Sequence, residues 1–218
     1  IDVRGDEIDM YLLFNSPLTP GSSVGVFTTG VRTVCQNTLN AGIARAVERR
    51  TLTHNAGVLK TMGKWLKEIY QNALEARLLL NEAYNVLADK RVSDAQVKWI
   101  ADTLYPLPKR PVESARARLP MIDRMRFYDM SVAYTERVRR TVYNLYDGMG
   151  VGMDTKAVKG TAFGAFNAVA EMETYRRGDN MKAAQGLIDG DRARRIRGGL
   201  TLAMNVDQWE TLDVTKLG

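Results

Sequence analysis

The first candidates for chemistry are the single cysteine, Cys35, and the single histidine, His54, of the 218-residue chain. A cysteine nucleophile needs a nearby base and a setting that lowers the pKa of its thiol, often a helix N-terminus. Cys35 falls in the first turn of an expected helix, and His54 follows it closely enough to fold back towards it. The alternative is that Cys35 is a small buried residue among apolar neighbours. We favour the buried interpretation, and we expect no catalytic residues and no enzyme activity.

The sequence gives little support for a metal or cofactor site. One cysteine and one histidine are too few for the usual soft-ligand metal sites. Asp189 and Asp191 fit a turn and an N-terminal cap for a helix that starts near Arg192 better than they fit a metal site. The GMGVGM segment at 148–153 follows an expected helix rather than a strand, so it does not match a dinucleotide-binding loop. The sequence therefore predicts no metal and no cofactor.

The basic residues are more informative. The chain has 31 Lys and Arg residues against 25 Asp and Glu, a net charge of +6. Nine basic and four acidic residues lie in 109–140, and seven basic and three acidic residues lie in 176–197. The first 31 residues hold one basic and four acidic residues. Two basic segments favour a surface that meets a polyanion, and solvated helix faces are the alternative.

Proteins that bind a single strand combine a basic groove with aromatic rings on which bases stack. Arg192, Arg195 and Gly199 lie three and four residues apart, Arg194 and Arg197 lie on an adjacent strip of the expected helix, and aromatic residues precede them in the sequence. For Phe163 the alternative is a place in the core, and for the arginines at 176–177 it is an interaction with a helix dipole. The predicted nucleic-acid-binding residues are Arg32, Lys156, Lys159, Phe163, Tyr175, Arg176, Arg177, Arg192, Arg194, Arg195 and Arg197.

The expected elements are a hairpin followed by helices. Residues 7–14 and 23–29 have the length and apolar content of two strands, and 15–22 between them is a turn segment with two prolines. A long apolar stripe predicts a helix over 58–88. Ser93 with Gln96 fits a capping box for a helix to about Leu104. Residues 105–114 hold three prolines and predict a loop, and Pro120 fits the first turn of a helix to about Tyr146.

These elements predict an α+β fold, with a small antiparallel β-hairpin or sheet followed by a predominantly helical region. We expect a single domain over 1–218 that continues a longer protein at its N-terminus. Within it, we expect a β-hairpin plus helix at 1–54, long helices at 55–104, a loop at 105–119 and a helical part at 120–218. No run of about eighteen apolar residues is present that would predict a membrane span.

Three segments resemble a known family in their order along the chain: VRTVCQNTL at 31–39, Thr53-His54 before a long helix, and GTAFGAFNAVAE at 160–171. They resemble phage- and plasmid-encoded proteins whose core domain is of unknown function. The chain departs from the family pattern where Thr53-His54 replaces a His-Thr order, and where Met172-Glu173 replaces an aromatic residue and a histidine. The resemblance implies a mobile-element setting and a cytoplasmic location in a bacterial host.

By analogy with single-strand annealing proteins, which form oligomers and need no nucleotide cofactor, the resemblance also suggests a function. The leading hypothesis is a single-stranded nucleic-acid-binding protein of phage or plasmid DNA metabolism that promotes strand annealing or recombination. Its partners would be single-stranded DNA or another nucleic acid and further copies of itself, and no membrane. The alternative is a structural or assembly protein that oligomerises through the 58–88 helix and the edge of the hairpin.

Overall fold

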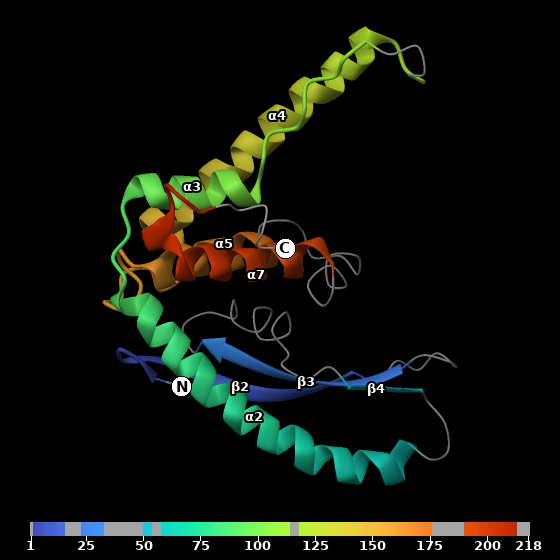
Figure 1. The fold of residues 1–218 in the computed structure, drawn as a ribbon, viewed down its shortest axis with the longest axis vertical. Coiled ribbons are helices and arrows are strands. Elements are labelled where there is room, and N and C mark those ends of the chain that lie inside the picture. The colour runs from blue at the N-terminus through green and yellow to red at the C-terminus, as the bar shows by residue number, and fades with distance from the viewer. Residues whose placement is uncertain are drawn as a thin grey trace.

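The computed structural model describes residues 2–15, 23–32, 50–53, 58–113, 118–175 and 190–212. In these ranges the chain is predominantly helical (Figure 1). The strands are β1 (Asp2–Val3), β2 (Asp6–Asn15), β3 (Ser23–Arg32) and β4 (Arg50–Thr53). The helices are α2 (Val58–Asp89), α3 (Asp94–Leu104), α4 (Met121–Asn144), α5 (Ala162–Tyr175) and α7 (Asp191–Met204), with a π-helical turn at Leu145–Met149 and a 3-10 turn at Val206–Gln208.

Helix α5 is the centre of the molecule. Every residue from Thr161 to Glu173 is buried. A helix that is apolar on nearly all sides is stable only when other helices surround it. Helices α2, α3, α4 and α7 all contact α5. The Tyr84 ring of α2 lies 5.3 Å from Phe163 and 6.1 Å from Phe166, measured between ring centroids.

Two glycines permit this close packing. A Cβ at Gly164 would lie 2.2 Å from the Val158 carbonyl oxygen, and one at Gly199 would lie 3.0 Å from Val169 Cγ1. Glycine at these two positions therefore lets the preceding turn segment and α7 approach the α5 backbone.

The predicted α+β class is wrong, because the fold is predominantly helical. The four strands pair antiparallel in the order β1-β2-β3-β4, and α2 runs along this layer in Figure 1. The buried residues that the structure describes come mostly from the helices and from the turn segment before α5. The physical reason is α5, which is buried on all sides and therefore needs helices around it rather than one face of a sheet.

Several helix predictions are confirmed. Helix α2 spans Val58–Asp89, and Ser93 with Gln96 forms both bonds of the capping box of α3. Residues 106–113 contain no helix or strand, and α4 begins directly after Pro120. The predicted cap of α7 is wrong, because Gly190 is the N-cap residue without a side-chain bond, and Asp191 lies inside the first turn. Asp189, Cys35 and His54 lie outside the described residues.

Candidate functional site: a hollow between α2 and β1

Among the described late arginines, three have partners within the protein. Arg192 donates to the Glu173 carbonyl oxygen at 3.1 Å, and Arg194 pairs with the Asp191 carboxylate one turn away. The Arg195 guanidinium lies 4.0 Å from the Glu173 carboxylate and 5.7 Å from the centre of the Tyr105 ring. The last of these arginines, Arg197, is exposed.

Phe163 is wrong as a base-stacking residue. Its side chain has no exposed surface and packs on Tyr84 in the core. The exposed side chains of Lys156 and Lys159 lie in the turn segment before α5. Arg32 is the last residue of β3 and Tyr175 the last of α5, whereas the arginines at 176–177 fall outside the described ranges.

A buried carboxylate joins α5 to its neighbours. Glu173 has no exposed surface, and its Oε1 accepts a 2.7 Å hydrogen bond from the Tyr105 hydroxyl. Arg139 of α4 donates through Nε to the Tyr105 carbonyl oxygen at 2.8 Å and pairs with Asp102 at 3.1 Å. With Arg195 on the other side, these groups connect α3, α4, α5 and α7. These bonds join four elements, so the cluster supports the fold.

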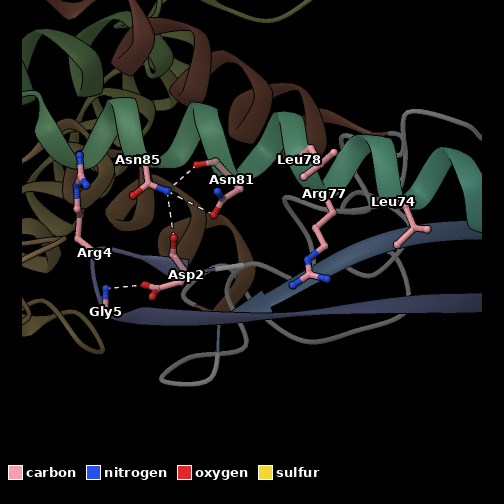
Figure 2. A pocket seen from close by; sticks show the side chains of 8 residues that line it. All are labelled: Asp2, Arg4, Gly5, Leu74, Arg77, Leu78, Asn81 and Asn85. Carbon is pink, nitrogen blue, oxygen red and sulfur yellow. Dashed lines mark hydrogen bonds between the residues drawn. The ribbon is translucent and has the colours of Figure 1, made fainter.

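An open site lies where α2 passes β1. Leu74, Leu78, Asn81 and Asn85 are four, three and four residues apart, so they share one face of α2, with Arg77 beside them. These side chains and those of the β1–β2 turn line a hollow of about 640 Å³ (Figure 2). This volume falls in the range of ligand pockets, about 300–1,000 Å³. Its lining residues are Asp2, Arg4, Gly5, Leu74, Arg77, Leu78, Asn81 and Asn85.

The backbone conformation of the β1–β2 turn and its hydrogen bonds hold it beside α2. Arg4 and Gly5 have φ angles of 52° and 88°, which allow a two-residue hairpin turn of the kind that fits the twist of paired strands. Gly5 N donates to the Asp2 carboxylate at 2.6 Å, and Asn85 Nδ2 donates to the Asp2 carbonyl oxygen at 3.0 Å. Arg4 pairs with Asp89 at the end of α2, with Nε donating at 2.9 Å. The turn is therefore attached to α2 at two points.

The Arg4 guanidinium lowers the pKa of the Asp89 carboxyl below its ordinary value of 3.8, chiefly through the hydrogen bond. A lowered folded-state pKa means that the pair stabilises the fold above that ordinary value, and that this contribution is lost as the pH falls through the folded-state pKa.

We expect Asp89→Asn to lower the melting temperature slightly at pH 7. The difference from the wild type should disappear in strong acid. Thermal melts of both proteins between pH 7 and strong acid test this prediction. A difference in melting temperature that grows towards low pH would contradict a stabilising Arg4–Asp89 ion pair.

The chemistry of the hollow is that of a polar binding site. Arg4 is neutralised by Asp89, whereas Arg77 is exposed and makes no hydrogen bond or ion pair with any described residue. In Figure 2 the Arg77 guanidinium extends from α2 towards the strands. Beside it, the side chains of Leu74 and Leu78 are 44% and 70% exposed, and the Asn81 carboxamide supplies a donor and an acceptor. The surface thus offers a free cation, an amide and apolar contact area together.

Sequence reasoning missed this site. The apolar stripe predicted the 58–88 helix but did not single out Arg77 on it. The available signal was the run Leu78-Leu79-Leu80, because three consecutive residues point in different directions around a helix and cannot all enter one core. The sequence pattern does not reveal that α2 lies along the strands, as Figure 1 shows.

Fold and site together define a helical protein with a polar hollow beside a small sheet. The sequence profile of the family called Domain of unknown function (DUF932) matches residues 1–197. The chain belongs to this family, as the sequence resemblance predicted. No curated protein and no solved structure matches the chain.

Two further observations concern the described part of the chain. It contains no helix that is both long and apolar enough to span a membrane. In the same ranges, no three His, Cys, Asp or Glu side chains are grouped so that they could hold a metal ion.

Proposed function

We propose that this protein binds single-stranded nucleic acid, and that the hollow between α2 and β1 is the contact surface. The observation that carries the proposal is the free guanidinium of Arg77 beside two exposed leucines and the amide of Asn81. A guanidinium donates to phosphate oxygens in a planar fork, and bases that are not paired offer apolar faces and hydrogen-bonding edges. The net charge of +6 favours the approach of a polyanion.

The proposed setting is the DNA metabolism of a phage or plasmid in the cytoplasm of a bacterial host, with strand annealing or recombination as the process served. The protein would act by binding and not as an enzyme. The groove proposed from the late arginines is replaced by the α2 surface, because Arg192, Arg194 and Arg195 already have partners.

Removal of the free guanidinium tests the site. We expect Arg77→Ala to weaken binding of a fluorescent single-stranded oligonucleotide by about tenfold, the effect of losing one charge-assisted hydrogen bond. The slope of log affinity against log salt should fall by about 0.7, because one phosphate no longer releases its counterion. Fluorescence anisotropy over a salt series, with DNA and RNA oligonucleotides, measures both.

Arg194→Ala is the matched control, since Arg194 is equally a surface arginine but is paired with Asp191. It should change the affinity less than twofold, on the scale of an exposed ion pair. A wild-type protein that binds no oligonucleotide at low salt would overturn the function. If Arg194→Ala lowered the affinity for the oligonucleotide and Arg77→Ala left it unchanged, the binding site would lie on α7 instead.

A further inference from the structure

An apolar stripe on α4 continues past the core of the molecule. Phe127, Met130, Tyr134, Val138 and Val142 are three or four residues apart, so they lie along one side of the helix. The C-terminal part of the stripe is buried, with Val138 4% exposed and Val142 fully covered. The same stripe therefore begins on open surface and ends inside the protein.

The N-terminal half of α4 projects from the body as an arm (Figure 1). Phe127, Met130 and Tyr134 are 58%, 69% and 47% exposed. The extended segment before α4 contacts the N-terminal part of the helix, where Arg124 donates to the Val112 carbonyl oxygen at 2.7 Å. An uncovered row of large apolar side chains at the surface of a protein marks an interaction site.

The uncovered stripe leads into a groove at the base of the arm. This groove has a volume of about 410 Å³. Exposed Met149 lies on one side of it, and the nearly buried Met172 of α5 contributes to its lining. The remaining lining residues are Tyr134, Arg137, Val138, Thr141, Asn144 and Leu145.

The charges on this face indicate which partner it fits. Asp123, Met130 and Arg137 are spaced by seven residues, so they fall on one line along the helix, with opposite charges at equal distances from Met130. Neither the Asp123 carboxylate nor the Arg137 guanidinium makes a hydrogen bond or ion pair with a described residue. A surface with this arrangement is complementary to its own copy turned by a two-fold axis.

We propose that two copies of this chain dimerise through α4, with the helices antiparallel and the two-fold axis at Met130. In this register each Asp123 faces Arg137 of the partner subunit, which gives two equivalent ion pairs. Phe127 faces Ala133 of the partner subunit, so a large side chain meets a small one. The exposed Ile122 faces Val138 of the partner subunit and enters the groove at the base of its arm.

Charge reversal tests both the surface and the register. The wild type should sediment as a dimer at micromolar concentration. Asp123→Arg and Arg137→Asp each place like charges opposite one another twice, and each should raise the dimer dissociation constant about tenfold or more. An equimolar mixture of the two variants should form a heterodimer, because every facing pair is then opposite in charge. The double variant should dimerise like the wild type.

Cross-linking provides a second measurement that does not depend on affinity. Met130→Cys places two thiols at the two-fold axis and should give a disulfide-linked dimer on mild oxidation. Leu79→Cys, an exposed position on α2, is the matched control and should cross-link far less. Circular dichroism melts check that each variant folds. A wild-type monomer at the highest concentration, or a mixture of the two charge variants that stays monomeric, would overturn the proposal.

Discussion

Replacing Phe163 with alanine should lower the free energy of unfolding by about 3–5 kcal/mol, the cost of deleting a buried aromatic ring. Phe163 has no exposed surface, and its ring packs on Tyr84. Typical domains are stable by only about 5–15 kcal/mol, so the variant should be close to unfolding. Urea unfolding measures the loss. Leu79→Ala, which removes a side chain that is 65% exposed, is the control and should change stability by less than about 0.5 kcal/mol.

A second substitution at Phe163 tests whether this residue acts in the core or stacks on a base. Phe163→Leu keeps an apolar side chain of similar size and should still fold, with a smaller loss of stability. Its affinity for a single-stranded oligonucleotide should equal that of the wild type, because the ring cannot reach a ligand. A loss of affinity without a loss of stability would restore the stacking role.

Replacing Glu173 with alanine should destabilise the fold by about 3 kcal/mol. The change leaves the buried Tyr105 hydroxyl without its acceptor and removes the carboxylate that faces Arg195. Asp191→Ala is a matched control, because Asp191 also pairs with an arginine of α7 but is exposed. It should cost less than about 1 kcal/mol.

A double-mutant cycle with Tyr105→Phe tests whether Glu173 stabilises the fold through its hydrogen bond with the Tyr105 hydroxyl. If the hydroxyl–carboxylate bond carries it, the two substitutions should be non-additive, with an interaction energy of about 1–2 kcal/mol. Urea unfolding of the four proteins gives this value. Additive losses would mean that Glu173 stabilises the fold through other groups.

The local predictions succeeded where neighbouring residues decide the structure. The capping box at Ser93, the start of α4 after Pro120 and the extent of α2 each depend on side chains within a few positions. The fold class failed for a different reason. The apolar content of β2 and β3 was visible, but the sequence pattern did not show that α5 would take the centre of the core.

The partners of the late arginines could not be predicted for a related reason. Basic residues at helical spacing look the same whether they meet solvent, a phosphate or a carboxylate from another element. Arg195 and Glu173 are 22 positions apart, and their contact depends on how α7 packs against α5. Conversely, Arg77 lines a hollow only because the tertiary structure places the β1–β2 turn beside α2.

The sequence by itself determined the extent of α2, the capping box of α3, the start of α4 after Pro120, the excess of positive charge and the family, because each depends on local spacing or on composition. Only the tertiary structure decided which charges remain free. That outcome depends on pairs far apart in the chain, such as Arg4 with Asp89 and Tyr105 with Glu173, which the packing of the helices brings within hydrogen-bonding distance.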